Sequence, residues 1–345
     1  MSLCGGSRPR TSIMATVLLI GLLMSALEAR GSQVGVCNGR IGDNLPSEQD
    51  TVNLFNSNGI TRMRIYDPNQ ATLQALRGTN IELMLGVANQ NLEALANDQQ
   101  AATSWVQANV MAFPDVKFRF IAVGNEVREN DPLAPFVVPA MQNIYAALRN
   151  ANLNINVSTA IDMSLLGVSY PPSAGAFTES SAPYLGKIVG FLASTGAPLL
   201  ANMYTYFSYI GNTKDIPLDY ALINKGSATP VQDGPLTYTN LYDATLDALY
   251  TAVEKAGGAN VEIVVSETGW PSEGDPSATV GNAAAYLGNL INHVSNNGTP
   301  KRPARTIETY LFAMFDENQK VGGETERHYG LFSPNQQPKY PIQIR

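Results

Sequence analysis

The sequence has few of the residues that mark several common functional classes. Only two cysteines and two histidines occur among 345 residues, which excludes a Cys/His zinc cluster and a disulfide-stapled scaffold. Charged residues make up only 15%, and no run of Lys or Arg is longer than two. With 22 basic and 29 acidic side chains, the chain lacks the basic surface that nucleic-acid binding requires. We therefore expect no metal site and no nucleic-acid partner.

The first 32 residues differ from the rest of the chain. Arg8 and Arg10 precede an apolar run at 14–26, and small residues follow up to Ser32. This order is typical of a secretory signal peptide. A membrane anchor is the alternative, but a run of 13 residues is short for a bilayer span. We predict a signal peptide at 1–32, a secreted extracellular protein and no membrane partner.

Apolar residues make up 44%, enough for a sizeable core, so a mainly disordered chain is excluded. From residue 33 onward, short apolar runs alternate with amphipathic stretches such as 47–57 and 240–255. The runs predict eight strands, at 33–37, 62–66, 81–87, 118–123, 155–160, 199–204, 261–266 and 309–315. Eight such units predict an α/β fold, a (β/α)8 TIM barrel, in a single domain at 33–345.

Two features refine this prediction. An open doubly wound sheet is the competing fold, but the first strand is followed by the segment 38–44, which lacks the G-x-G-x-x-G turn. The connection between the sixth and seventh strands is long and rich in aromatic residues, at 206–238. We expect it to form an elaborated loop subdomain on the catalytic face.

Two glutamates directly follow apolar runs. Glu126 ends the fourth predicted strand and Glu267 the seventh. Either alone could be a helix N-cap or a solvated loop charge. In a (β/α)8 barrel, however, the carboxyl ends of the strands meet at the active site. Two convergent carboxylates are what cleavage of a glycosidic bond needs, one to protonate the leaving oxygen and one to attack or to activate water.

Several longer motifs resemble those of plant β-1,3-glucanases of glycoside hydrolase family 17, over nearly all of residues 33–340. The matching segments are Arg64-Ile-Tyr-Asp-Pro, Ala122-Val-Gly-Asn-Glu-Val, Tyr170-Pro-Pro-Ser-Ala-Gly-Ala-Phe, Val264-Val-Ser-Glu-Thr-Gly-Trp-Pro-Ser and Phe315-Asp-Glu-Asn-Gln-Lys. The resemblance implies a (β/α)8 barrel and a retaining mechanism, and we expect no cofactor because hydrolysis by two carboxylates needs none. It makes Glu126 the acid/base and Glu267 the nucleophile. Asn125 resembles the residue that binds the sugar 2-hydroxyl.

Further residues are expected to hold the substrate or orient the nucleophile. Tyr66 and Tyr204 end the second and sixth predicted strands, and a phenol near Glu267 would orient it. The chain has Thr205 where the family often has proline after this tyrosine. Glu317 and Lys320 resemble a family pair that hydrogen-bonds substrate, and Glu317 is the second candidate for the acid.

Aromatic residues near the expected mouth are candidates for stacking on glucose rings. Trp270, Tyr206 and Phe207 follow the seventh and sixth predicted strands, and the faces of a pyranose ring are apolar enough for aromatic contact. Ordinary packing in the core is the alternative for Trp270.

Three functions fit these residues. The favoured one is an endo-hydrolase of β-1,3-glucan, such as callose, laminarin or fungal wall glucan. A mixed-linkage β-1,3-1,4-glucan hydrolase of the same fold is the second. The third is a glucan-binding protein without activity, which the presence of both Glu126 and Glu267 disfavours. We expect a monomer with β-glucan as its partner, serving defence or callose turnover, and a surface turn at the glycosylation sequon of Asn297.

Overall fold

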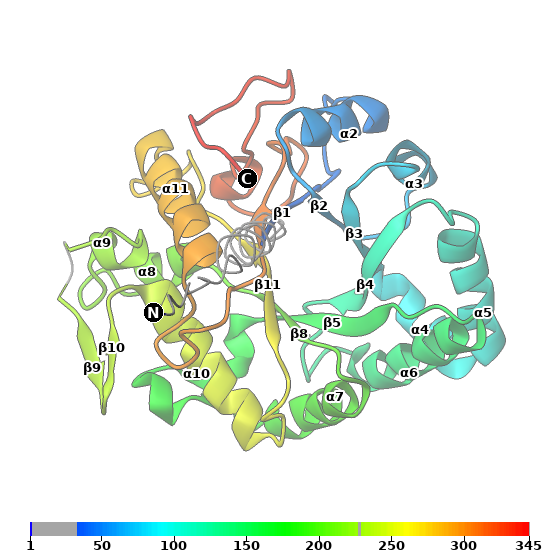
Figure 1. Ribbon diagram of the computed structural model, residues 1–345, viewed down its shortest axis with the longest axis horizontal. Helices are drawn as coiled ribbons and strands as arrows, with labels where there is room; N and C mark the ends of the chain where they lie inside the picture. The colour runs from blue at the N-terminus through cyan, green and yellow to red at the C-terminus, as the bar shows by residue number, and fades with distance from the viewer. Residues whose placement is uncertain (2–32, 227–228, 345) are drawn as a thin grey trace.

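Eight parallel strands close into a barrel in the computed structural model, which describes Met1 and residues 33–226 and 229–344 (Figure 1). The strands are β1 (Val34–Cys37), β2 (Arg62–Ile65), β3 (Glu82–Val87), β4 (Lys117–Asn125), β5 (Asn156–Asp162), β8 (Leu199–Asn202), β11 (Ile263–Thr268) and β12 (Thr309–Phe312). They pair in the order β1-β12-β11-β8-β5-β4-β3-β2, so the first and last strands are neighbours. The predicted (β/α)8 fold is confirmed. The predicted signal peptide lies, apart from its first residue, outside the described residues.

Helices follow the strands and form the outer layer (Figure 1). They are α2 (Glu48–Ser57), α3 (Gln70–Leu76), α4 (Leu92–Asn97), α5 (Gln99–Val106), α6 (Ala134–Asn150), α7 (Ala182–Thr195), α8 (Thr205–Gly211), α9 (Leu218–Ala221), α10 (Leu241–Lys255) and α11 (Val280–Asn296). The stretches predicted at 47–57 and 240–255 are α2 and α10. Each helix has an N-cap residue whose side chain accepts a hydrogen bond from the backbone amide three residues later. Ser47 accepts from the amide of Asp50, and Asn240 accepts from the amide of Asp243.

Two apolar cores lie on the two sides of the barrel wall. The larger one fills the space between strands and helices, with Val36, Ile65 and Leu85 among its members. The smaller one contains Cys37 and Met84 together with Tyr310 and Phe312, on alternate positions of the same strands. Parallel strands covered on both faces have little exposed surface, which is why the barrel segments read as nearly continuous apolar runs.

The connection between β8 and α10 is the segment in which the sequence predicts a loop subdomain. It contains α8, α9 and the hairpin of β9 (Val231–Asp233) and β10 (Leu236–Tyr238), which lies at the edge of the molecule in Figure 1. A second hairpin, β6 (Leu166–Val168) with β7 (Ala176–Phe177), follows β5. The remaining single turns are η1 (Asn89–Asn91), η2 (Gln107–Met111), η3 (Met163–Leu165), η4 (Pro172–Ala174) and η5 (Glu324–Arg327).

All eight strands differ from their predicted bounds by one to three residues, and two of these differences are at the ends of β11 and β12. β11 extends to Thr268, so Glu267 is inside the strand and not after it, and β12 ends at Phe312 instead of residue 315. The ladder of β12 is interrupted at Ala313, whose amide donates to the carbonyl of Tyr329, whereas the amide of Met314 again donates to Cys37 of β1. The sequence stays apolar at residues 313–315, beyond the last residue of β12, so the apolar run did not reveal where the strand ends.

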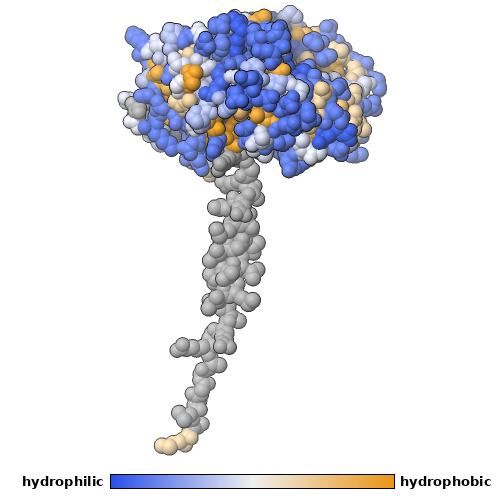
Figure 2. All heavy atoms as spheres, turned by 90° about the horizontal axis from the view of Figure 1, so that it is seen from above, coloured by the Kyte–Doolittle hydropathy of each residue, from blue (hydrophilic) through white to orange (hydrophobic). Residues whose placement is uncertain are grey.

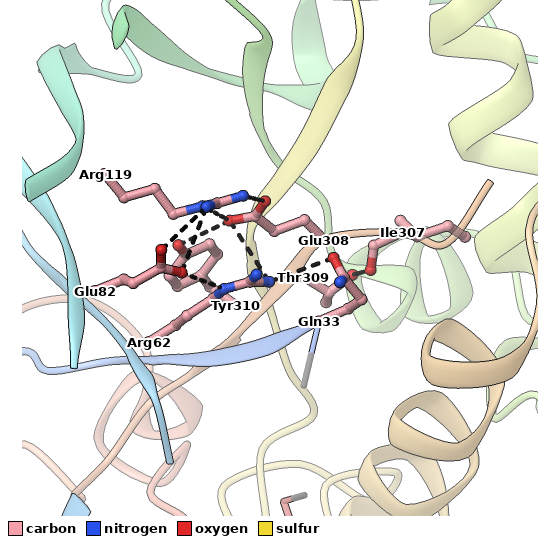
Figure 3. A network of polar contacts seen from close by, with 8 residues as sticks. All are labelled: Gln33, Arg62, Glu82, Arg119, Ile307, Glu308, Thr309 and Tyr310. Carbon is pink, nitrogen blue, oxygen red and sulfur yellow. Dashed lines mark hydrogen bonds and ion pairs between the residues drawn. The ribbon is translucent and has the colours of Figure 1, made fainter. Parts of the chain in front are cut away.

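An ion-pair network closes the end of the barrel at which the strands begin (Figure 3). Arg119 donates to both carboxyl oxygens of Glu308, at 2.7 and 2.6 Å, and Arg62 donates to Glu82 at 3.1 Å. The hydroxyl of Tyr310 donates to Glu308 at 3.0 Å. These charges fill the barrel at the end opposite to the carboxyl ends of the strands.

The surface visible in Figure 2 is mostly hydrophilic, with small separate hydrophobic patches. Within the described part of the chain, no helix has both the length and the apolar character needed to cross a bilayer.

Candidate active site

Glu126 and Glu267 both line one cleft at the carboxyl ends of the barrel strands, with a volume of about 910 Å³. Glu267 belongs to β11, whose register against β8 shifts between Val265 and Glu267. The register of β4 against β5 shifts between Ala122 and Asn125, immediately before Glu126. Such irregularities re-aim side chains at the rim of a barrel. Two strands separated in the sequence thereby direct their carboxyl groups into a common cleft.

Three donors hold the carboxyl group of Glu267. The guanidinium of Arg64 donates to Oε1 at 2.9 Å, and the hydroxyl of Tyr66 donates to the same oxygen at 2.7 Å. The hydroxyl of Tyr204 donates to Oε2 at 2.7 Å. Glu267 is only 6% exposed, so these donors replace its hydration. The arrangement stabilises an ionised carboxylate and fixes the direction in which it points.

Glu126 has a different environment. Its Oε1 accepts a hydrogen bond from Nδ2 of Asn202 at 2.8 Å. Burial raises the pKa of Glu126, and the negative charge of Glu267 raises it further, while the hydrogen bond from Asn202 partly opposes both effects. One carboxyl is thus surrounded by donors and the other is disposed to keep its proton. This difference is what assigns separate acid and nucleophile roles to a pair of glutamates.

The backbone at Glu126 is unusual. Its φ of 54° lies in the left-handed region, which a residue with a side chain rarely adopts. The amide of Glu126 donates to the carbonyl of Ala160 on β5 at 2.9 Å, which anchors the backbone in this conformation. Strained backbone of this kind persists where the surrounding structure fixes it.

Asn125 contacts Arg64 and Asn202, the residues that donate to Glu267 and Glu126 respectively. Its Oδ1 accepts from Nη2 of Arg64 at 2.6 Å and from Nδ2 of Asn202 at 3.1 Å. Two donors hold the side-chain oxygen of Asn125, so its NH2 group points away from Arg64 and Asn202 and is available to a ligand. The expected contact of Asn125 with a sugar hydroxyl stays a prediction.

Glu317 and Lys320 also line the cleft, from the segment after β12. Glu317 is 3% exposed, and its Oε1 accepts from the amide of Ile41 at 2.9 Å. Burial raises the pKa of Glu317. Lys320 pairs with Glu326 at 3.3 Å and lies over the ring of Phe312, 4.0 Å from its centroid. Their expected contact with substrate stays a prediction.

The three aromatic candidates are placed differently. Phe207 on α8 is 44% exposed and lines the cleft, with its ring edge-on to Tyr204 at 5.6 Å. Trp270 does not line the cleft: it is 1% exposed, packs against Tyr206 and Tyr286, and donates its indole N–H to the carbonyl of Ser277. The expected stacking of Trp270 on sugar needs correction, since its ring faces are covered by the core. Tyr206, also 1% exposed, is covered in the same way.

The sequence analysis missed Arg64, Asn202 and Ser266, all buried at this site. A signal for Arg64 was available. Arg62 and Arg64 alternate with Met63 and Ile65 on β2, so both arginines point into the barrel, where an unpaired charge would be costly. No comparable signal marked Asn202, because an asparagine at a strand end is common in loops.

Nothing in the site is arranged as a metal centre. Within residues 33–226 and 229–344, no group of three or more His, Cys, Asp or Glu side chains is placed to hold a metal ion. The chemistry derived below uses the carboxyl groups and their hydrogen-bond donors.

Comparison with known proteins places this geometry in a family. The model of the family described as "Glycosyl hydrolases family 17" matches residues 34–344. The chain belongs to glycosyl hydrolase family 17. It is similar to a glucan endo-1,3-beta-glucosidase of Vitis vinifera, with 55% identity over 340 residues that cover 96% of this chain and 98% of the relative. It is also similar to the acidic isoform GI9 of the enzyme of the same name from Nicotiana tabacum, with 52% identity and 96% of each chain covered.

Solved structures agree with this family membership. A plant β-glucan endohydrolase, from a pair described as having distinct substrate specificities, matches with a TM-score of 0.86 and 49% identity over 90% of this chain and 99% of its own. The β-1,3-glucanase and pollen allergen CJP38 of Cryptomeria japonica matches with a TM-score of 0.87 and 48% identity, over the same shares of the two chains. The expected family, fold and reaction class are confirmed: this chain is a glycoside hydrolase.

Proposed function

We propose that this protein is an endo-hydrolase of β-1,3-glucan that works by a retaining mechanism. The observation that carries the proposal is the contrast between the two carboxyl groups of one cleft. Glu267 receives hydrogen bonds on both oxygens, whereas Glu126 has a raised pKa and a single side-chain donor. The names of the family 17 relatives supply the 1,3-linkage and the endo mode of cleavage.

In the first step, the ionised carboxylate of Glu267 attacks the anomeric carbon and forms a glycosyl ester. The bond from that carbon to the glycosidic oxygen breaks, and Glu126 gives its proton to the departing oxygen. In the second step, Glu126, now ionised, takes a proton from water. The resulting hydroxyl attacks the anomeric carbon and releases Glu267 as a carboxylate. Two inversions at the same carbon retain the β configuration.

The hydrolysis of three polymers tests the substrate assignment. Release of reducing sugar should be fast on laminarin and slow on barley mixed-linkage glucan and carboxymethylcellulose. Preference for the barley polymer would instead make the protein a mixed-linkage hydrolase. Binding to laminarin without hydrolysis would make it an inactive glucan-binding protein.

The anomer released first tests the mechanism. NMR of fresh products should show the β-anomer before mutarotation. Retention also requires that the carboxyl groups of Glu126 and Glu267 lie about 5–5.5 Å apart. Initial α-anomer would identify an inverting enzyme that needs space for water between the carboxyl groups.

We further propose that the protein is secreted as a monomer after removal of residues 1–32. The basic, apolar and small residues at the start of the sequence support secretion. Asn297, exposed at the end of α11, is the better of two glycosylation sequons, because the other begins inside β5 at Asn156. N-terminal sequencing of protein from plant culture medium, mass analysis before and after glycosidase treatment, and light scattering test these three points.

A further inference from the structure

The side-chain amide of Asn202 makes four hydrogen bonds. Its Oδ1 accepts from Nη1 of Arg64 at 2.8 Å and from Oγ of Ser266 at 2.8 Å. Its Nδ2 donates to Oδ1 of Asn125 at 3.1 Å and to Oε1 of Glu126 at 2.8 Å. An amide oxygen has two lone pairs and an amide nitrogen has two hydrogens, so the capacity of the group is fully used.

Only one orientation of this amide is compatible with its surroundings. A flip would place the NH2 group of Asn202 against the donors of Arg64 and Ser266, and its oxygen against the carboxyl group of Glu126. Asn202 is 2% exposed and Ser266 is 0% exposed, so bulk water offers no substitute partner. Unmade hydrogen bonds at such a depth are costly.

The chain of bonds runs from one catalytic strand to the other. Ser266 immediately precedes Glu267 on β11, and Asn202 is the last residue of β8. The carbonyl of Ser266 accepts from Arg64 at 2.8 Å, so the segment that carries the nucleophile is itself anchored. The hydroxyl of Ser266 then fixes Asn202, which contacts Glu126.

We propose that Ser266 and Asn202 are positioning residues that determine which oxygen of Glu126 carries its proton. Oε1 of Glu126 faces the NH2 group of Asn202 and therefore serves as an acceptor. The proton of the acid form is left on Oε2, and the same donor remains in place when Glu126 later acts as a base. The proposal rests on the proposed function, since it assumes that Glu126 is the acid/base.

Two leaving groups separate this role from a structural one. Departure of a sugar from laminarin needs a proton, whereas departure of a dinitrophenolate from an aryl β-laminaribioside does not. For Ser266→Ala, we expect kcat/KM to fall about tenfold or more on laminarin and less than about threefold on the aryl substrate. Asn202→Asp has nearly the same shape but lacks both N–H donors. Its loss of kcat/KM on laminarin should exceed its loss on the aryl substrate by a larger factor than in Ser266→Ala.

Ser158→Ala is the matched control. Ser158 on β5 is also 0% exposed, and its hydroxyl donates to the carbonyl of Pro198 at 2.6 Å, without contact to either glutamate. Its loss removes one buried strand hydroxyl of the same barrel. The ratio of rates on the two substrates should therefore stay at the wild-type value.

The alkaline limb of the pH profile gives an independent readout. Asn202→Asp replaces a donor to Glu126 with an acidic group, which raises the pKa of Glu126. The alkaline limb of kcat/KM on laminarin should therefore move to higher pH, while Ser158→Ala should leave it in place. Equal losses on both substrates, or an unchanged limb in Asn202→Asp, would overturn the proposal. Wild-type protein without activity on laminarin would instead refute the proposed function, so the two failures are distinguishable.

Discussion

At the scale of single residues, Glu126 and Glu267 have the same side chain and differ in their partners. Three donors surround Glu267, whereas burial and the neighbouring charge raise the pKa of Glu126. The proposed assignment of roles rests on these surroundings, and it can be tested by removing each carboxyl group in turn.

Glu267→Gln should abolish turnover on every substrate, because an amide cannot form the glycosyl ester. Glu126→Gln should lower kcat/KM on laminarin by about 10²–10⁴, the usual contribution of general acid catalysis, and far less on an aryl substrate. Steady-state kinetics on the two substrates measures the difference.

Azide rescue provides the control for this assignment. With Glu126→Ala, azide should yield a β-glycosyl azide, since the anion attacks the intermediate from the side where water would arrive. An α-linked azide from the same variant would show that Glu126 is the nucleophile. Near-normal hydrolysis of polymer by Glu126→Ala would transfer the acid role to Glu317.

The pH dependence follows from the same two groups. Glu126 must hold its proton for the first step, and its raised pKa extends the active range toward neutral pH. Activity on laminarin, measured as kcat/KM, should fall as pH rises through this pKa. In Glu126→Gln, the alkaline limb should be absent, and its persistence would assign that limb to another group.

At the scale of elements, the segments after β1 and β12 form one wall of the cleft. The amide of Ile41 donates to Glu317 at 2.9 Å, and the amide of Gln319 donates to the carbonyl of Ile41 at 3.1 Å. A β-carbon on Gly39 would overlap both carboxyl oxygens of Glu317. The two segments fit together only because residue 39 has no side chain.

Gly39→Ala should therefore push the segment after β1 away from the segment after β12. We expect this to lower the free energy of unfolding by about 1–3 kcal/mol. We also expect a higher KM for laminarin, because Glu317 and Lys320 line the cleft here. Chemical denaturation and steady-state kinetics measure the two effects. In Gly190→Ala, on the exposed face of α7, an added β-carbon meets nothing within 4 Å. This control should be neutral or stabilising by up to about 1 kcal/mol. If Gly39→Ala behaves like the control, the contact with Glu317 does not constrain the wall.

The elements also show how far the sequence determined the site. The apolar runs before Glu126 and Glu267 predicted both strands and the face on which the glutamates lie, because strand ends in a barrel share one rim. The register shifts before these glutamates were not predictable, since a shift arises from pairing with a neighbouring strand. Trp270 was misplaced for a related reason: an aromatic residue at the rim can face the cleft or the helices, and periodicity stops at the strand end.

At the scale of the whole molecule, β2 links the two ends of the barrel. Its inward positions carry Arg62 at the closed end and Arg64 farther along, and Tyr66 follows at the mouth. The first arginine belongs to the ion-pair network of Figure 3, and the second contacts Glu267. One strand therefore supports stability at one end and catalysis at the other, which predicts that the two properties can be altered separately.

Glu308→Gln tests this separation. The Glu308 side chain is 10% exposed and is the shared partner of Arg119 and Tyr310. Loss of its charge leaves Arg119 with Glu82 as its remaining carboxylate partner, at 3.4 Å, and breaking a buried pair from one side costs about 3 kcal/mol. For a domain of this size, Tm should fall by roughly 4–5 °C.

The catalytic rate supplies the decisive comparison for this variant. At room temperature, kcat on laminarin should equal the wild-type value, because the network lies at the end of the barrel opposite to the cleft. Asp115→Asn is the control: it breaks an exposed pair with Arg77 at 2.8 Å and should cost less than about 1 kcal/mol. Differential scanning calorimetry and initial rates measure both quantities. A large loss of kcat in folded Glu308→Gln would mean that the two ends of the barrel are coupled through the inward side chains of β2, so that the network also sets the position of Arg64 against the nucleophile.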